Sequence, residues 1–129
     1  MKIFSFEGIE GVGKSTQINL LKEYLEINGY STEILREPGS TITGESIRSI
    51  LLDSKENLSS ESELLLMFAA RAQLITEKVN NSNSDIILFD RFYDASVAYQ
   101  GFGRNLPIDF IQSLITFINC PEPCLTFLL

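Results

Sequence analysis

The segment from Gly8 to Ser15 reads G-I-E-G-V-G-K-S, which matches the spacing G-x-x-x-x-G-K-[ST] of a phosphate-binding loop. Glycines let successive backbone N–H groups turn inward on a polyphosphate, and a helix N-terminus adds free donors and a positive dipole end. In such a loop the Lys14 ammonium reaches the β and γ phosphates, while the Ser15 hydroxyl ligates Mg²⁺. The pattern therefore predicts a site for a nucleoside triphosphate with Mg²⁺.

Two other interpretations of this loop fit the residues less well. A dinucleotide-binding fingerprint requires glycine or alanine at its last position, where this chain has Thr16. A chance glycine turn is disfavoured because the apolar run Ile3 to Phe6 precedes the loop and a helical pattern follows it. The residues predicted to contact the nucleotide are Gly8, Ile9, Glu10, Gly11, Val12, Gly13, Lys14, Ser15 and Thr16.

A second group of chemically useful residues follows the apolar run Ile86 to Phe89. That run ends in Asp90, and many phosphate-loop proteins present such an acid to the Mg²⁺ shell at the carboxyl edge of the sheet. Arg91 comes next, so the Asp-Arg pair can serve both the metal shell and a second anion. GTPase segments of the types D-x-x-G and N-K-x-D do not occur in the sequence. These residues favour a kinase that acts on small phosphorylated acceptors.

Elements able to position these residues can be predicted along the chain. Short β-rich runs alternate with helical patterns, which predicts an α/β fold with a parallel sheet flanked by helices. Strands are expected at Lys2 to Phe6, Thr32 to Arg36, Asp85 to Asp90 and Leu125 to Leu129. Helices are expected from near Ser15 to Asn28-Gly29, from near Thr43 to about Asp53, from Ser60 to about Val79, through Asp94 to Gln100, and from Pro107.

The third of these helices is the longest. The spacing Ser60-x-x-Glu63 predicts a capping box at its start. Its predicted core face is a stripe at alternating steps of three and four residues, formed by Leu65, Phe68, Ala72, Ile75 and Val79.

Length and composition limit the class of protein. With 129 residues, 44% of them hydrophobic, the chain is expected to form one domain over residues 1–129 with a substantial core. The net charge of −7 argues against binding to a nucleic-acid backbone. The apolar stretch Leu64 to Ala70 is too short to cross a bilayer, and Glu7 interrupts the first apolar run, so a cytoplasmic protein without a secretory signal is expected.

The two cysteines, Cys120 and Cys124, fit neither a C-x-x-C redox motif nor, in a chain without histidine, an ordinary zinc site. We expect both to be reduced structural thiols.

Four segments resemble thymidylate kinases, which use ATP to phosphorylate dTMP to dTDP. They are Phe6-Glu7-Gly8, Arg36-Glu37-Pro38-Gly39-Ser40-Thr41, Asp90-Arg91-Phe92 and Ala98-Tyr99-Gln100-Gly101. Their order and spacing match the family across the whole chain. The resemblance implies a P-loop nucleoside monophosphate kinase fold, ATP and dTMP as ligands, Mg²⁺ as cofactor, and a homodimer for the intact family member.

The resemblance also implies roles for residues around the acceptor. Glu10 matches the acidic loop residue that approaches the sugar 3′-hydroxyl. Arg36 and Glu37 match the segment that closes over the acceptor site, and Arg48 matches an arginine that binds the dTMP phosphate.

For the thymine base, Arg71 matches the arginine that contacts its edge. Ser96 and Gln100 match the polar pair that reads the base, and their separation of four residues places them on one helix face. Tyr99 is expected to line the same cleft.

At the reacting centre the resemblance implies Lys14, Arg91 and Glu10 as catalytic residues, with Arg91 also contacting the acceptor. Ser15 and Asp90 are the predicted Mg²⁺ ligands.

The sequence departs from the family pattern at two of these places. Ser40 stands where glycine is usual, so a positive φ there would carry a steric cost. Met67 stands where an aromatic residue usually stacks on thymine. Because Met67 shares a helix face with Arg71, we expect it to cover the base, and we expect Phe68 to serve packing or a secondary contact.

The sequence ends at Leu129 within an apolar strand, whereas relatives continue into a mobile lid and further helices. No residue from Ile9 to Val12 is cationic, and in relatives with such a loop the lid supplies the catalytic arginines. We therefore expect a truncated family member that catalyses poorly as given. The alternatives are another nucleoside monophosphate kinase, or a nucleotide-binding remnant without turnover.

Overall fold

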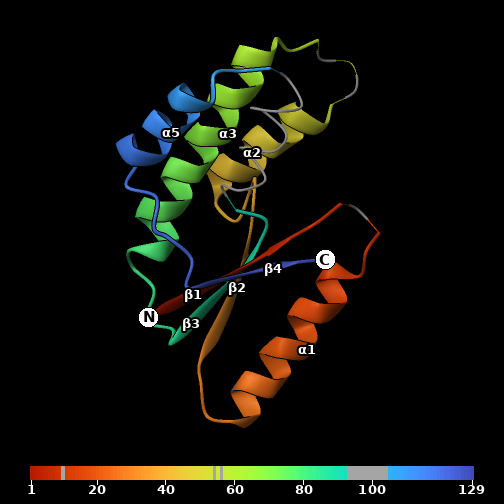
Figure 1. The fold of residues 1–129 in the computed structure, drawn as a ribbon, viewed down its shortest axis with the longest axis vertical. Coiled ribbons are helices and arrows are strands. Elements are labelled where there is room, and N and C mark those ends of the chain that lie inside the picture. The colour runs from red at the N-terminus through yellow and green to blue at the C-terminus, as the bar shows by residue number, and fades with distance from the viewer. Residues whose placement is uncertain (10, 54, 56, 93–104) are drawn as a thin grey trace.

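A parallel sheet of four strands, in the order β2-β3-β1-β4, forms the centre of the fold (Figure 1). The computed structural model describes residues 1–9, 11–53, 55, 57–92 and 105–129. The strands are β1 (Lys2–Glu7), β2 (Thr32–Arg36), β3 (Ile86–Asp90) and β4 (Leu125–Leu128), all within a residue of the predicted positions. The predicted α/β class with a parallel sheet is confirmed.

The strand register brings the predicted site segments to one edge of the sheet. Asp90 at the end of β3 lies opposite Phe6 of β1 on one side and Arg36 of β2 on the other. Because all these strands are parallel, their carboxyl ends meet at that edge. The phosphate loop, the turn after Arg36 and the segment after Asp90 therefore leave the sheet side by side.

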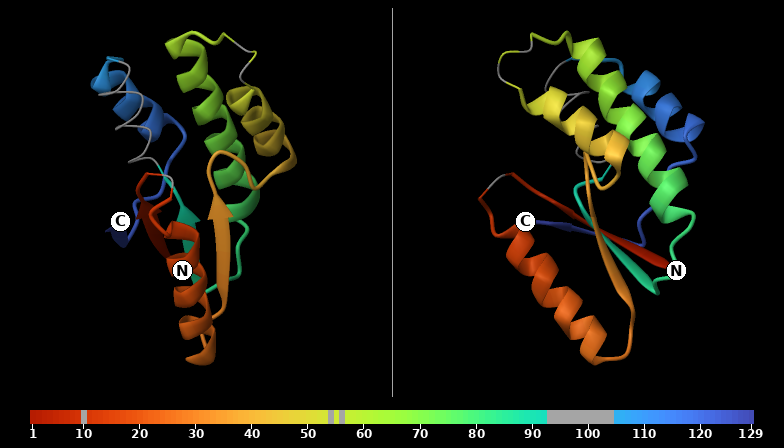
Figure 2. Two further views of the ribbon diagram at one scale, coloured as in Figure 1. Left: turned by 90° about the vertical axis from the view of Figure 1, so that its right-hand side faces the viewer. Right: turned by 180° about the vertical axis from the view of Figure 1, so that it is seen from behind.

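Helices cover both faces of the sheet. Helix α1 (Lys14–Ile27) lies on one face, while α2 (Ile42–Leu52), α3 (Ser60–Leu74) and α5 (Ile108–Phe117) gather on the other side, as both rear and front views show (Figures 1 and 2). The central strand β3 is buried on both faces, which explains its unbroken apolar run. The helix predicted through Asp94 to Gln100 lies outside the described residues.

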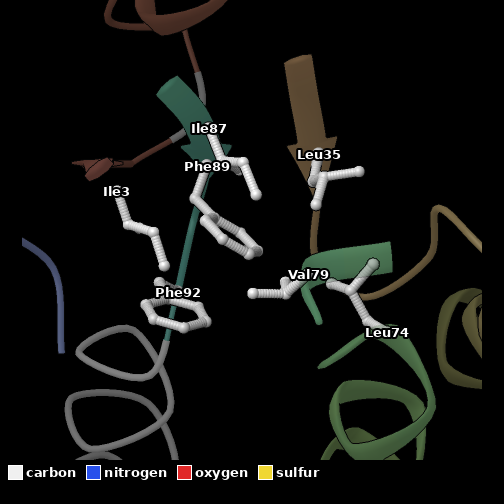
Figure 3. Packing of buried hydrophobic residues seen from close by; sticks show 7 residues of the cluster. All are labelled: Ile3, Leu35, Leu74, Val79, Ile87, Phe89 and Phe92. Carbon is white, nitrogen blue, oxygen red and sulfur yellow. The ribbon is translucent and has the colours of Figure 1, made fainter. Parts of the chain in front are cut away.

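The alternation of side chains along β3 divides the core into two main clusters. Leu88 packs toward α1 in a cluster whose members are Phe6, Ile18, Leu25, Ile86 and Leu88. Ile87 and Phe89 point the opposite way, into a cluster with Ile3, Leu35, Leu74, Val79 and Phe92 (Figure 3). In this second cluster the Phe89 and Phe92 rings stack with centroids 4.2 Å apart.

The third helix begins at Ser60 as predicted, but the predicted N-cap was wrong by one residue. Its N-cap is Ser59, not Ser60: Ser59 has an extended backbone, and its hydroxyl accepts a hydrogen bond from the Ser62 N–H at 3.0 Å. The third helical position is then serine rather than glutamate, so no capping box forms. The helix continues beyond Leu74 as a π-helical turn, η1 (Ile75–Val79).

The predicted core stripe of this helix was wrong at its N-terminal end. Phe68, Ile75 and Val79 are buried as predicted, but Leu65 is 53% exposed. Leu64 is buried instead, in a cluster with Phe68 and Ile111 of α5. The buried face also contains a charged residue, Arg71, which a search for apolar periodicity passes over.

Pro107 forms the N-cap of α5, as expected for a residue that opens the helix.

Both cysteines are free thiols. Burial raises the pKa of the Cys120 thiol to about 12, so this side chain stays protonated beside the core.

No helix in the described part of the chain is long and apolar enough to cross a membrane.

Candidate active site

A cavity of about 640 Å³ opens at the carboxyl edge of the sheet. This volume falls in the range of roughly 300–1,000 Å³ that is typical of small-molecule sites. Its walls come from the phosphate loop, the turn after β2, helices α2 and α3, and the segment after β3. The lining residues are Ile9, Gly11, Gly13, Lys14, Ser15, Thr16, Arg36, Glu37, Pro38, Arg48, Leu51, Leu52, Glu63, Met67, Arg71, Asp90, Arg91 and Phe92.

Positive charge is concentrated on this cavity. Half of the chain's 10 lysines and arginines line it, namely Lys14, Arg36, Arg48, Arg71 and Arg91. A chain with a net charge of −7 thus keeps a local site for anions.

The phosphate loop leads directly into α1. Gly13 precedes the first helical residue with a φ of 83°, a left-handed conformation that favours glycine, and no side chain caps the helix there. The N–H groups of the first turn are therefore not taken by a side-chain cap. This geometry suits an anion at the helix N-terminus.

Lys14 is paired across the mouth of the cavity with Asp90, with Nζ 3.2 Å from Oδ1. The Lys14 side chain is only 8% exposed, so this lysine is buried although it directly follows a loop. The pair fixes the ammonium group between the loop and the end of β3.

The cavity suits Mg²⁺ held mainly by a bound nucleotide. Ser15 and Asp90, the predicted ligands, both line it. The described residues contain no group of three or more acidic, cysteine or histidine side chains that could form a complete metal cage. Mg²⁺ is commonly bound by one or two protein oxygens together with phosphates and waters, and hydroxyl and carboxylate oxygens fit that role.

A buried ion pair forms the inner wall. Arg71 and Glu37 are 2% and 5% exposed, and Arg71 Nε donates to Glu37 Oε2 at 2.6 Å. A second guanidinium nitrogen, Nη2, pairs with the same oxygen. Burial alone would lower the pKa of Arg71, but the charge and hydrogen bond of Glu37 raise it, so the guanidinium stays protonated. Arg71 also lies over the Phe68 ring, 4.9 Å from its centroid.

The structure separates the two residues considered for base contact. Met67 lies on the cavity wall, one helical turn before Arg71. Phe68 is buried in the cluster with Leu64 and Ile111 and does not line the cavity. Contact of Met67 with a base stays a prediction.

Ser40, in the turn after β2, and Arg91, on the cavity wall, adopt a left-handed backbone although they are not glycine, with φ of 67° and 71°. Each such residue costs about 1–2 kcal/mol. At Ser40 this is the conformation for which a steric cost was expected. Its hydroxyl accepts from the Arg36 N–H at 2.8 Å and donates to the Arg36 carbonyl at 3.1 Å, which offsets the strain.

The same turn fixes the Arg36 side chain. Arg36 Nη2 donates to both carboxylate oxygens of Glu45, at 3.1 and 2.9 Å. Glu45 Oε1 also accepts the Ser40 N–H at 3.0 Å. One carboxylate therefore connects the turn after β2 with α2.

Substitutions at Ser40 should separate strain from hydrogen bonding. Ser40→Ala keeps the strained Cβ but loses both hydroxyl contacts, so we expect a loss of about 1–2 kcal/mol in the free energy of unfolding. Ser40→Gly loses the same contacts but relieves the strain, so we expect stability nearer the unmodified chain. Urea unfolding of the three proteins measures the order. Equal stability of Ser40→Ala and the unmodified chain would contradict the role given to the hydroxyl.

Not every predicted site residue can be placed in the cavity. Glu10, Ser96, Tyr99 and Gln100 lie outside the described residues. Gly8 and Val12 belong to the loop but do not line the cavity.

The sequence reasoning missed several lining residues, namely Pro38, Leu51, Leu52, Glu63 and Phe92. Helical spacing could have found three of them. Leu51 and Leu52 follow Arg48 by three and four residues, and Glu63 precedes Met67 by four.

The phosphate loop lies at the carboxyl edge of a parallel sheet, next to the Asp90-Arg91 pair, and Arg36, Arg48 and Arg71 line the same cavity. This arrangement defines the class of P-loop nucleoside monophosphate kinases. The family model for thymidylate kinase matches residues 6–129. The chain therefore belongs to the thymidylate kinase family.

Individual relatives agree with this assignment. The thymidylate kinase of Thermosipho africanus (strain TCF52B) is 50% identical over 115 residues, covering 88% of this chain and 57% of that protein. The thymidylate kinase of Chlorobaculum tepidum is 43% identical over 131 residues, covering 98% of this chain and 61% of that protein. The chain thus spans less than two thirds of the length of these curated relatives.

A solved structure shows the same fold. The crystal structure of thymidylate kinase from Ehrlichia chaffeensis superposes with a TM-score of 0.90 at 38% identity, covering 98% of this chain and 73% of that one.

Proposed function

We propose that the protein transfers the γ-phosphoryl group of ATP to dTMP, giving dTDP, with Mg²⁺ as cofactor. Membership of the thymidylate kinase family supports this reaction. The observation that carries the proposal is the gathering of Lys14, Asp90 and the cavity arginines around one space. Two anionic ligands that must approach each other need such a common cationic site.

The donor phosphates are assigned to the phosphate loop. The N-terminal N–H groups of α1 and the Lys14 ammonium would bind them, and Ser15 and Asp90 would hold Mg²⁺. When bound, the metal neutralises charge on the phosphate oxygens. Since Lys14 already pairs with Asp90, it is positioned beside the metal shell before the nucleotide arrives.

The acceptor is assigned to the opposite wall. Arg48 Nη1 donates to the Pro38 carbonyl at 2.9 Å, which anchors the guanidinium while its other nitrogens can serve an acceptor phosphate. Arg36, Met67 and Arg71 line the same side. The residues proposed to complete the acceptor site are Glu10, Glu37, Ser96, Tyr99 and Gln100, with Phe68 behind Met67.

Little covalent chemistry is asked of the protein. The acceptor oxygen is already anionic, so no general base is required, and catalysis consists mainly of positioning and charge neutralisation. Lys14 and Arg91, which both line the cavity, supply that positive charge. We also propose a homodimer for the intact protein, which sedimentation equilibrium would test.

Acceptor competition tests the reaction. The protein is incubated with ATP, Mg²⁺ and equal concentrations of dTMP, dUMP, dGMP and AMP, and the diphosphates are separated by chromatography. We expect dTDP to dominate, and we expect no product when EDTA removes the metal. Dominance of another diphosphate would assign a different nucleoside monophosphate kinase. Calorimetric binding of ATP and dTMP with no diphosphate formed would assign a nucleotide-binding protein without turnover.

Arg48 provides a second test of the acceptor site. Arg48→Gln removes a charge-assisted contact to the acceptor phosphate, so we expect dTMP to bind about 10–100-fold more weakly while ATP binding is unchanged. Calorimetry with each ligand measures both. Lys2→Gln, an exposed charge change at the start of β1, is the matched control. Equal losses for both ligands would place Arg48 outside the acceptor site.

A further inference from the structure

Arg91 is the residue at which the chain turns away from the sheet into the cavity. It follows Asp90, the last residue of β3, and its φ of 71° is left-handed. A long side chain persists in this conformation only where its surroundings fix the backbone. The contacts on either side of Arg91 therefore decide where its guanidinium group lies.

Two N–H groups of this turn, those of Arg91 and Phe92, donate hydrogen bonds to residues at the end of β1. The Arg91 N–H donates to the Phe6 carbonyl at 3.0 Å, which extends the ladder between β1 and β3 by one bond. The next amide, that of Phe92, donates instead to a side-chain oxygen, Glu7 Oε1, at 2.9 Å. The Glu7 carboxylate thus holds the backbone directly after Arg91, where the chain leaves the sheet.

Packing fixes the residue after Arg91 as well. Phe92 is buried and stacks on Phe89 within the cluster that includes Ile3, Leu74 and Val79 (Figure 3). With Asp90 in the sheet and Phe92 in the core, the Arg91 side chain is left on the cavity wall. Phe92 is therefore held by apolar packing of its ring and by the hydrogen bond from its N–H to Glu7.

The Glu7 carboxylate is buried, which lowers stability unless nearby groups compensate its charge. Glu7 is only 6% exposed, and burying an anion is unfavourable unless a cation or hydrogen bonds compensate it. The Phe92 N–H supplies one such hydrogen bond, and Glu7 also makes a small contribution to the raised pKa of Arg71, behind that of Glu37. An apolar residue of similar size could fill the space, but it could not accept the hydrogen bond from the Phe92 N–H.

We propose that Glu7 is a positioning residue. By accepting the Phe92 N–H, it keeps Arg91 in the left-handed conformation that places its side chain on the cavity wall with Lys14 and Asp90. The kinetic part of this inference rests on the proposed phosphoryl transfer, in which Arg91 neutralises charge. The backbone part does not depend on it.

Two substitutions separate the hydrogen bond from simple space filling. Glu7→Gln keeps an acceptor oxygen at the same length, whereas Glu7→Leu removes it at similar volume. We expect Glu7→Leu to lower kcat at least tenfold with little change in KM for ATP, and Glu7→Gln to restore most of that loss. Equal losses in the two variants would overturn the proposal, because the acceptor would then not matter.

A double-variant cycle tests whether Glu7 acts through Arg91. In an Arg91→Ala background, Glu7→Leu is expected to cause no further fall in kcat. A residue that merely supports the fold would reduce kcat by the same factor in both backgrounds, and that result would contradict the positioning role.

Hydrogen exchange at the Phe92 amide tests the backbone contact without any turnover. We expect protection of this amide in the unmodified protein and in Glu7→Gln, and at least tenfold faster exchange in Glu7→Leu. Unchanged protection in Glu7→Leu would defeat the inference. A failure of the unmodified protein to form dTDP would instead defeat the proposed function, so the two failures can be distinguished.

Discussion

Replacing Lys14 with Met is expected to lower phosphoryl transfer by about 10²–10³-fold, the usual effect of removing one preorganised group that stabilises developing charge. Lys14 lines the cavity at the start of α1, where it would contact the β and γ phosphates. Methionine keeps an apolar chain in the buried position and removes only the charge. The rate of dTDP formation at saturating ATP and dTMP measures the effect.

Stability must be followed in the same variant because Lys14 is buried and paired with Asp90 at 3.2 Å. Asp90 stays 27% exposed, so water can solvate its carboxylate and we expect only a small loss of stability. Lys22→Met is the matched control, since Lys22 is also on α1 and pairs with an acid, Glu26, outside the cavity. Full turnover by Lys14→Met would reject the phosphate-loop assignment.

Breaking the buried pair on the inner wall is expected to give the largest loss of stability. Arg71→Met leaves the Glu37 carboxylate buried without its countercharge, which typically costs about 3–5 kcal/mol. It also removes the guanidinium from the face of the Phe68 ring. Urea unfolding, with comparison of the denaturant slope between variants, measures the change in the free energy of unfolding.

The reverse change and the double change make this prediction specific. Glu37→Leu removes the carboxylate that pairs with the buried Arg71 guanidinium, so we expect a similarly large loss. The double variant replaces both charges with apolar groups and is expected to be more stable than either single variant. Glu26→Gln, in the exposed pair with Lys22, is the control and is expected to cost far less. Losses that simply add would show that the two side chains do not depend on each other.

Local patterns were sufficient to predict most of the framework. The strands at Lys2 and Thr32 were predicted because apolar runs bounded by turn residues are local signals. The phosphate loop was predicted because the required glycines, lysine and serine are adjacent in sequence. The N-cap of α3 was misplaced by one residue, although its first residue was not, because Ser59 and Ser60 are equally good caps in sequence and only Ser59 is the extended cap residue.

Contacts between distant residues could not be read from such patterns. Glu37 and Arg71 are 34 residues apart, and Glu7 and Phe92 are 85 residues apart. Each pair forms only because parallel strands bring different segments to one edge of the sheet. Arg71 was expected at the base edge from the family resemblance, but its burial against a carboxylate depends on the turn after β2. At the start of α3, the choice between Leu64 and Leu65 as the buried residue likewise depends on contact with α5.

The uneven distribution of charge has a kinetic consequence. Five cations and three acids, Glu37, Glu63 and Asp90, line the cavity in the described part of the structure, so the remaining five cations and fourteen acids give the rest of the chain a charge of −9. The net charge of the rest of the chain therefore repels an anionic nucleotide, whereas the residues that line the cavity attract it. Such a field directs diffusing anions toward the cavity, and dissolved salt screens it at distances beyond about 10 Å at 0.1 M ionic strength. Encounter with both ligands is thus governed by the contrast between cavity and surface rather than by the net charge.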